Sequence, residues 1–424
     1  MTEWRPTPSL LRAVLLALAG LAGALLTGSP SLVVLASPFV LLAGAGVLAH
    51  PRTRPQCTSA LDHDRLHEGQ GTTSRLHLRD GAGVEQVTRV ASPVPYVATL
   101  PASGVSGAAT SDGLPALEYG PRRWGRRDLG VERVALTSGW AGWRWGPVDL
   151  PFRQLHVLPQ TAPFDARSEV PQPDGLVGAH RARRPGSGTE LEGIRPFAAG
   201  DRLRRISWPV TLRTGEVHAV TTRAEQDAGV WLVLDALREI GWSGGIDGEA
   251  SSLDLTVRAG SALAAHHLRQ GDRVGLLVLG AEVTRVPLGS GPRHLHRIEG
   301  TLVRVRADPR RTPPERLELG AAAGSIVHVL SPMLQASVVT AAATLQRRGL
   351  SVVVIDTLGH HEPAEDRLST AGLAWRMRMV EREDRLDALA TLGCPVVRWQ
   401  GPGTLDEVLQ RLARRARVPR VGAR

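Results

Sequence analysis

The chain has 424 residues, a length that favours two or three domains over a single core. Its formal net charge is +10, and all 51 basic residues are arginines. A positive balance favours anionic partners, but the arginines are dispersed among acids and no zinc-finger or RNA-binding motif accompanies them. We therefore expect no nucleic acid as a partner. Cys57 and Cys394 are too few for a disulfide framework or a four-cysteine zinc site, and we expect both to be reduced.

The first feature along the chain is an apolar stretch without charge from residue 13 to residue 49. Gly28-Ser29-Pro30 divides it into the spans Ser9–Gly28 and Ser31–Ala49. Each span has about 20 residues and would be about 30 Å long as a helix, which matches a bilayer core. We predict a transmembrane helical hairpin within residues 9–50. A cleaved signal peptide is the alternative, and the second span argues against it.

The charges that flank this hairpin indicate its orientation. The turn between the spans is uncharged, whereas Arg5 and Arg12 lie before or at the start of the first span and Arg52 and Arg54 follow the second. Because positive residues are enriched on the cytoplasmic side, we expect both ends of the hairpin to be cytoplasmic. The sequence thus predicts a cytoplasmic body held against the cell membrane, with the lipid bilayer as a partner.

Residues 55–160 are predicted to form a β-rich, sandwich-like domain. Short runs alternate apolar and polar residues between Gly, Pro and Ser, as in Ser74–Asp80, Val131–Gly139 and Arg153–Pro159. Such spacing is typical of a small β-sandwich. Four tryptophans fall in this region, Trp124, Trp140, Trp143 and Trp145. We interpret them as core and juxtamembrane packing, with a carbohydrate or peptide platform as the alternative.

Residues 161–187 are rich in Pro, Arg and Gly and predict a flexible linker. From residue 229 to residue 420 the pattern changes, and buried strands alternate with helices. The strands are expected at Gly229–Ala236, Asp272–Gly280, Ser325–Pro332, Leu350–Thr357 and Cys394–Trp399. The helices are expected at Leu253–Arg269, Pro292–Arg304, Leu334–Arg348, within Ala364–Thr391, and at Leu405–Ala416. This alternation predicts parallel strands with right-handed crossovers, hence a doubly wound α/β domain.

Several histidines in this region invite a metal-site interpretation. They are His266-His267, His294 with His296, and His360-His361 beside Glu362. Adjacent residues on a helix point about 100° apart, so the first pair is poorly placed to share one ligand. We expect these histidines to be exposed or to cap helices.

A charged segment, residues 188–228, joins the β-rich region to the α/β domain. It contains the run from Glu190 to Asp201, ELEGIRPFAAGD, then Arg205-Ile206-Ser207-Trp208 and Leu212-Arg213. This pattern resembles the bacterial family called domain of unknown function 58, whose motif is roughly Glu-Phe-x-Gly-Leu-Arg-x-Tyr-x-Pro-Gly-Asp, then Arg-x-Ile-Asp-Trp and Ala-Arg. The resemblance covers nearly the whole chain, because the hairpin, the β region, the signature and the C-terminal domain follow the family's order. The sequence departs from the motif at Phe197, Ala199, Ser207 and Leu212.

The signature supplies the candidate binding residues Glu190, Arg195, Gly200, Asp201, Arg205, Trp208 and Arg213. Asp201 is a candidate N-cap for a short helix that includes Leu203–Ile206. The arginines and acids of the segment are close enough in sequence to form ion pairs. Two interpretations stay open. One is a surface that recognises an anion or a partner, and the other is a structural ion-pair network with Trp208 buried.

The resemblance also implies that the C-terminal domain is of the von Willebrand factor A type. Such domains often bind Mg²⁺ through Asp-x-Ser-x-Ser after the first strand and further oxygen ligands from later loops. Here the first motif is Asp235-Ala236-Leu237-Arg238-Glu239, and Ser331-Pro332 stands where Ser-Asp is usual. We expect Asp235 to be a degenerate metal-site position that caps the following turn, with no metal and no cofactor.

For function, we expect a non-enzymatic, membrane-anchored scaffold or adaptor of the cytoplasmic face. The resemblance implies a MoxR-type AAA+ ATPase as its partner, in a chaperone-like system. Two alternatives remain. One is a hydrolase acting on envelope precursors, although no Ser or Cys stands beside a recognisable catalytic base. The other is a protein that binds anionic lipid or polymer through its arginine clusters.

Overall fold

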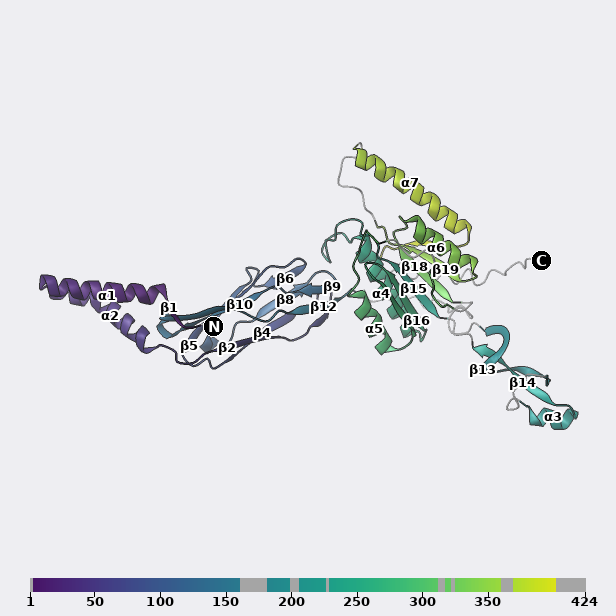
Figure 1. Cartoon of the computed structure of the whole chain (residues 1–424), viewed down its shortest axis with the longest axis horizontal. Helices are drawn as coiled ribbons and strands as arrows, with labels where there is room; N and C mark the ends of the chain where they lie inside the picture. Colours follow the sequence, from purple (N-terminus) through teal and green to yellow (C-terminus); the bar gives the residue numbers. More distant parts are fainter. Residues whose placement is uncertain are drawn as a thin grey trace. The chain divides into compact units, whose positions relative to one another are not determined.

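The computed structural model describes residues 3–160, 181–198, 206–225, 229–311, 317–321, 325–359 and 369–401. The chain divides into two compact units. The first comprises Met1–Gln160 with Gly245–Asp247, and the second comprises Thr161–Gly244 with Gly248–Arg424. The first unit contains a helical hairpin and several β-sheets, and the second contains an α/β sheet and a two-stranded ribbon (Figure 1).

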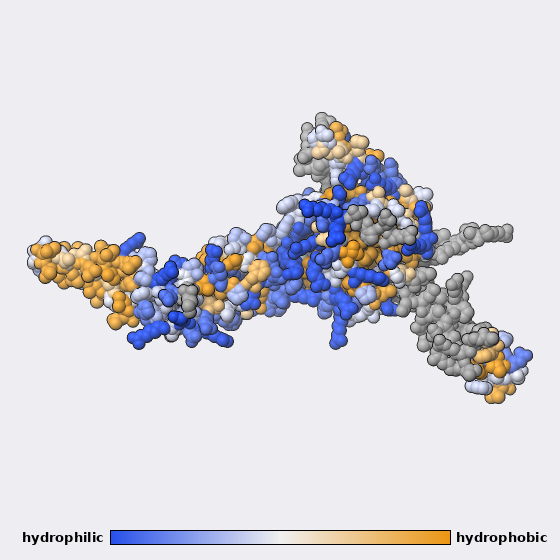
Figure 2. All heavy atoms as spheres, viewed as in Figure 1, coloured by the Kyte–Doolittle hydropathy of each residue, from blue (hydrophilic) through white to orange (hydrophobic). Residues whose placement is uncertain are grey.

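The first unit opens with two apolar helices, α1 (Pro8–Thr27) and α2 (Pro30–Leu48). The Thr7 hydroxyl caps α1 by accepting a hydrogen bond from the Leu10 amide, and α1 ends at Gly28, whose φ of 66° is left-handed. The expected break at residues 28–30 is thus where the chain turns. Both helices are long and apolar enough to cross a membrane, and their surface is almost entirely apolar in Figure 2.

Small residues allow the two helices to approach closely. Ala13, Ala17 and Ala36 are buried between them, and a Cβ atom on Gly20 would lie 2.6 Å from the Cβ of Ala36. The leucines and valines on the outer faces are exposed instead. Small residues inside and large apolar residues outside are the arrangement expected of helices that face lipid.

Both ends of the hairpin are tied to the sheets that follow. Trp143 donates its indole N–H to the Gly46 carbonyl (2.8 Å), and Trp4 donates to the Thr53 carbonyl (2.9 Å). The short strand β1 (Arg5–Pro6) pairs with β11 (Trp143–Asp149). The hairpin is therefore anchored through backbone groups on both of its ends.

The remaining strands of the first unit form the sheet region, residues 56–158. They are β2 (Gln56–Leu61), β3 (Arg65–His67), β4 (Thr72–Arg79), β5 (Val84–Ala91), β6 (Val97–Leu100), β7 (Val105–Ala109), β8 (Leu117–Pro121), β9 (Gly125–Asp128), β10 (Glu132–Ser138) and β12 (Gln154–Leu158). They build sheets of order β1-β11-β10-β5-β7, β2-β4-β8-β6 and β3-β12-β9. The three alternating runs expected from the sequence are strands β4, β10 and β12.

A buried polar network joins the two larger sheets. Arg89 of β5 is 0% exposed and pairs with Glu132 of β10 (2.7 Å). Its guanidinium also donates to the Ser74 carbonyl of β4, and the Tyr119 hydroxyl of β8 donates to Glu132 (2.7 Å). Because of burial and the neighbouring Glu132, the pKa of Tyr119 is raised. The network thus links the inner faces of both sheets.

The tryptophans of the sheet region have different environments. Trp124 and Trp145 are buried, and Trp143 reaches the hairpin and makes an edge contact with His50. These three fit the expected core and juxtamembrane packing. Trp140 is 66% exposed and does not.

The second unit is built on a six-stranded sheet. Its strands are β15 (Val230–Asp235), β16 (Val274–Leu279), β17 (Val283–Gly289), β18 (Ile326–Ser331), β19 (Ser351–Asp356) and β20 (Val396–Arg398), in the order β17-β16-β15-β18-β19-β20. Five strands are parallel, and every residue of β15, β16 and β18 is buried, as expected of strands covered on both faces. The antiparallel edge strand β17 was not anticipated from the sequence.

Helices cover both faces of this sheet. They are α4 (Ser252–Arg269), α5 (Pro292–Leu302), α6 (Ala336–Arg347) and α7 (Thr370–Thr391). Figure 1 shows α4 and α5 on one face and α6 and α7 on the other. On the second face, Trp231 and Val329 of the sheet pack in one cluster with Leu345 of α6 and Leu386 of α7. The expected α/β pattern is therefore present, although the helix expected at 405–416 lies outside the described residues.

The signature falls on a ribbon of β13 (Arg181–Pro196) and β14 (His218–Glu225) that carries the short helix α3 (Trp208–Thr214). Trp208 is 61% exposed, which contradicts the alternative in which it is buried. The helical turn expected at Ile206 is wrong, because Ile206 forms a β-bridge with Ala219. Pro209, in the first turn of α3, explains the helix start, because its fixed φ suits that position. Of the expected linker, residues 161–180 lie outside the described residues, and β13 already begins at Arg181.

Candidate functional site

The order of strands in the second unit indicates at which end of the strands a ligand site is expected. The chain leaves β15 to form β16 on one side and later forms β18 on the other side. The carboxyl ends of β15 and β18 therefore meet at a topological switch point, where open α/β sheets bind their ligands. β15 ends at Asp235 and β18 ends at Ser331.

Asp235 and Ser331 are hydrogen-bonded to each other at this point. The Ser331 hydroxyl donates to Asp235 Oδ2 (2.6 Å), and the Leu237 amide donates to Oδ1 (3.2 Å). The hydroxyl itself accepts from the Met333 amide (2.9 Å). Asp235 is 3% exposed, and this burial raises its pKa although both hydrogen bonds oppose the shift. Asp235 thus caps the turn after β15, and protein donors engage both of its oxygens.

These residues do not fit a magnesium site. A hard cation needs several free carboxylate or hydroxyl oxygens. Asp235 already accepts two hydrogen bonds, and Arg238, which is exposed, adds a positive charge to the same loop. Within the described ranges, no group of three or more His, Cys, Asp or Glu side chains is arranged to hold a metal ion. We therefore derive no chemistry through a metal at this edge.

A buried guanidinium links the neighbouring strand ends to α7. Arg382 of α7 is 3% exposed and forms an ion pair with Asp356, the last residue of β19. Its Nε donates to the Pro332 carbonyl (2.7 Å) in the turn that follows β18. The Asp356 carboxylate also accepts from the Leu358 amide (3.0 Å). Arg382 therefore fixes α7 against the turns that follow both strands.

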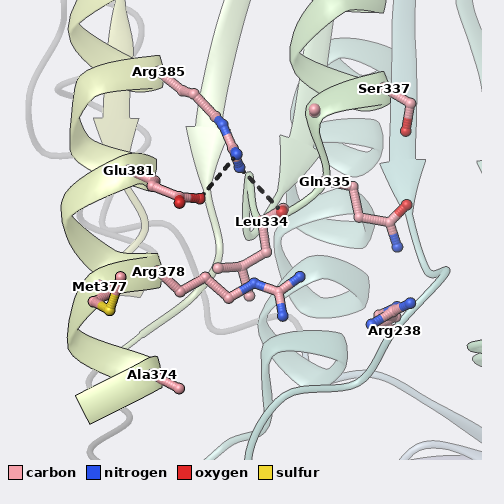
Figure 3. Close-up of a pocket in the computed structure, with 10 residues that line it drawn as sticks. Arg238, Leu334, Gln335, Ser337, Ala374, Met377, Arg378, Glu381 and Arg385 are labelled. Carbon is pink, nitrogen blue, oxygen red and sulfur yellow. Dashed lines mark hydrogen bonds and ion pairs between the residues drawn. The ribbon is translucent and has the colours of Figure 1, made fainter.

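A pocket of about 640 Å³ opens beside this contact. Its walls are Arg238 after β15, residues 334–337 at the start of α6, and one side of α7. Figure 3 shows the Arg378 side chain reaching from α7 across the pocket, with Arg238 on the opposite wall. Arg385 donates to Glu381 (3.2 Å) and to the Leu334 carbonyl (3.4 Å). The pocket thus combines three arginines with one glutamate and apolar wall atoms.

On the opposite face of the sheet, α4 covers a group of buried histidines. His267 is buried and its Nδ1 pairs with Asp272 Oδ2 (2.8 Å), while its ring centroid lies 5.3 Å from that of His328 on β18. Burial and the neighbouring histidines lower the pKa of His266 to about 4 and that of His328 well below its usual value. His266 and His328 are therefore neutral at neutral pH.

This arrangement corrects two expectations. His267 is not exposed, because it lies on the side of α4 that faces the sheet. His294 is also buried, with its Nε2 2.8 Å from the Val274 carbonyl, whereas His296 is exposed. His360 and His361 lie outside the described residues.

The signature residues are only partly described. Glu190 and Arg195 belong to strand β13, but their side chains lie outside the description, as do Gly200, Asp201 and Arg205 entirely. Trp208 and Arg213 are exposed on α3. The described part of the signature therefore presents these two side chains to solvent, and the expected ion-pair network is not among the described contacts.

Sequence reasoning missed the residues of α7 that shape the pocket. Arg378, Arg382 and Arg385 belong to a helix with many alternating charges, and nothing in the local pattern distinguishes the buried Arg382 from its exposed neighbours. Asp356 ends an apolar run as Asp235 does, and this repeated strand-to-Asp transition is the one signal that was available in the sequence.

Comparison with known proteins supports the resemblance over the second unit. Residues 193–388 match the family described as "Protein of unknown function DUF58". Uncharacterized proteins of Mycobacterium bovis and Mycobacterium tuberculosis are each 29% identical to this chain over 188 residues. The aligned segment is 44% of this chain and 53% of each relative, so the chain spans about half the length of the curated relatives it matches.

Proposed function

We propose that this protein is a membrane-anchored, non-enzymatic scaffold whose α/β domain, of the von Willebrand factor A type, binds other proteins on the cytoplasmic side. The hairpin carries this proposal. Its outer faces are apolar along both helices, and both of its ends are bonded to a folded sheet region. Such a hairpin would hold the rest of the chain at the bilayer surface.

The carboxyl ends of the strands in the six-stranded sheet support protein binding. The pocket lies at the switch point, where ligands bind in this class of sheet. Because Asp235 is engaged by Ser331 and Leu237, recognition there would use direct contacts in place of a bridging metal. The resemblance described above favours a MoxR-type AAA+ ATPase as the partner, in a chaperone-like system.

The orientation can be tested with single cysteines at the two ends of the hairpin. Ser31, at the turn, and Arg54, beyond α2, are both exposed. In intact cells, a membrane-impermeant maleimide should label Ser31→Cys and should label Arg54→Cys only after the membrane is opened. Labelling of Arg54→Cys in intact cells would contradict a cytoplasmic body.

The partner can be tested by affinity capture of the full chain from detergent-solubilised membranes. We expect capture to enrich an AAA+ ATPase, more strongly in one nucleotide state than in the other. An unrelated membrane protein with two spans, captured with the same tag, is the control. Failure to enrich any such ATPase with either ATP analogue or ADP would overturn the partner assignment.

A further inference from the structure

We propose that the pocket beside α7 binds an acidic, amphipathic segment of a partner protein, with a carboxylate between Arg238 and Arg378 and apolar side chains along α7. This inference rests on the proposed scaffold function and specifies the chemistry of the partner. It extends the site from the strand ends to the outer face of α7.

The electrostatic part of the site consists of two guanidinium groups. Arg385 is engaged by Glu381 and by the Leu334 carbonyl. Within the described residues, by contrast, Arg238 and Arg378 form no hydrogen bond or ion pair, and both are exposed at the pocket. Guanidinium groups bind carboxylates through charge-assisted, often bidentate hydrogen bonds. The pocket therefore has positive charge in excess, placed for a carboxylate.

The apolar part of the site is a stripe on α7. Leu373, Met377 and Val380 are all exposed, and their spacing of four and three residues places them on one side of the helix. Met377, which is 68% exposed, also lines the pocket. Amphipathic segments bind a partner's groove through apolar side chains at helical spacing. An apolar stripe beside two arginines fits such a segment when it also carries acidic residues.

The combination favours a protein segment over a phosphate-bearing ligand. Phosphate or a lipid headgroup would use the two arginines and leave the stripe of α7 uncovered. Nucleic acid binding relies on an extended basic surface, whereas Glu381 and the apolar wall interrupt the charge here. A segment with acidic and apolar residues covers both features at once.

The test uses the full chain in nanodiscs of zwitterionic lipid. The probe is a fluorescein-labelled helical peptide with leucines on one face and glutamates on the other, followed by fluorescence anisotropy. We expect saturable binding that weakens with added salt. Arg378→Glu should lower the affinity at least about tenfold, and Met377→Ser should lower it about threefold.

Matched controls separate this site from general attraction. Arg376 is exposed on the same helix but does not line the pocket, so Arg376→Glu should change the affinity less than about twofold. A peptide with glutamines in place of glutamates should bind weakly. Equal losses in the two arginine variants, or equal binding of the glutamine peptide, would overturn the proposal. The proposal would also be overturned if inorganic phosphate, phosphatidylglycerol vesicles or a single-stranded oligonucleotide displaced the labelled peptide at a lower concentration than the unlabelled peptide needs.

The outcome is distinguishable from that of the affinity capture. Peptide binding that depends on Arg378, with no ATPase enriched from membranes, would support the pocket and reject the ATPase as partner. If the Arg378→Glu chain enriched an ATPase as strongly as the wild type, the scaffold function would stand but the pocket would not be its docking site.

Discussion

Two buried arginine–carboxylate pairs serve different parts of this molecule. Arg89 and Glu132 lie between the two larger sheets of the first unit, where Ser74 and Tyr119 complete the hydrogen bonds. Arg382 and Asp356 lie at the carboxyl edge of the second sheet, where Arg398 approaches Asp356 at 3.9 Å and Glu383 approaches Arg382 at 3.2 Å from the solvent side. The first pair is enclosed by strands, and the second joins a helix to strand ends.

The difference suggests which pair can affect binding. A pair enclosed by two sheets contributes to the stability of the sheet region, since every group around it belongs to that core. A pair at the end of the parallel strands also sets the position of α7, and α7 supplies one wall of the pocket. The same chemistry should therefore have a structural effect in one unit and an additional effect on ligand affinity in the other.

The largest effect is expected from Arg89→Met. The substitution leaves the Glu132 carboxylate buried without its cation, which should lower the free energy of unfolding by about 3–5 kcal/mol. Chemical denaturation of the full chain, followed by tryptophan fluorescence, measures the change. Arg75→Met is the control, because its ion pair with Asp62 is exposed, and no detectable change is expected. Equal free energies of unfolding for the Arg89 and Arg75 variants would contradict a larger contribution from the buried ion pair than from the exposed one.

Arg382→Met should cost somewhat less, about 3 kcal/mol, because Asp356 keeps the Leu358 amide and gains from the approach of Arg398. It should also weaken binding of the acidic peptide at temperatures where the chain is folded, since α7 loses its bond to the Pro332 carbonyl. Arg89→Met should leave the affinity of the folded chain unchanged. Anisotropy titrations of both variants compare the two regions, and a loss of affinity in both would contradict the separation.

The sequence predicted the elements better than it predicted the site. Continuous apolar runs such as 230–235 and 326–331 identified the buried strands because length and hydrophobicity are local properties. The edge strand β17 was missed, since Thr284, Arg285 and Pro287 interrupt its apolar residues. Helix α3, which starts at Trp208 with Pro209 in its first turn, was not predicted, and residues 201–205 of the expected capped helix lie outside the described residues.

The pocket could not be predicted, because it depends on contacts between distant positions. Asp235 was identified, but its pairing with Ser331 depends on the parallel neighbours β15 and β18. Arg382 acquires its role only once α7 lies across the ends of β18 and β19. These contacts depend on how the strands pair and how α7 packs on the sheet. The pattern of charges along one helix does not predict them.

A smaller effect is expected at the buried histidines. His328 is neutral in the folded state, since burial first, and then His267 and His266, lower its pKa well below the ordinary value near 6.5. As the pH falls below about 6.5, the unfolded chain takes up a proton that the folded chain does not, so stability is lost toward acid by at most about 1.4 kcal/mol per pH unit for this group. His328→Leu should therefore lose less stability than the wild type between neutral pH and pH of about 5.

Denaturation curves at a series of pH values measure that difference. Both ring nitrogens of His328 are without a described hydrogen-bond partner, so leucine should be tolerated at neutral pH. His296→Leu, at an exposed position, should follow the wild-type pH dependence. Parallel curves for the wild type and His328→Leu would show that this histidine does not limit acid stability.

The smallest effect is expected from Asp235→Asn at the switch point. Burial already raises the pKa of Asp235, so removing its charge should be inexpensive, and the amide oxygen can still accept the Ser331 hydroxyl. We expect a loss of about 1 kcal/mol, because the new NH2 group faces the Leu237 N–H and that hydrogen bond is lost. Denaturation with and without millimolar MgCl₂ decides between a turn cap and a metal ligand. A ligand role would make Mg²⁺ stabilise the wild type but not the variant, because an ion that binds only the folded state shifts the unfolding midpoint. For a capping role, both midpoints should be insensitive to Mg²⁺, which leaves the arginines of the neighbouring pocket as the groups that select a ligand at this edge.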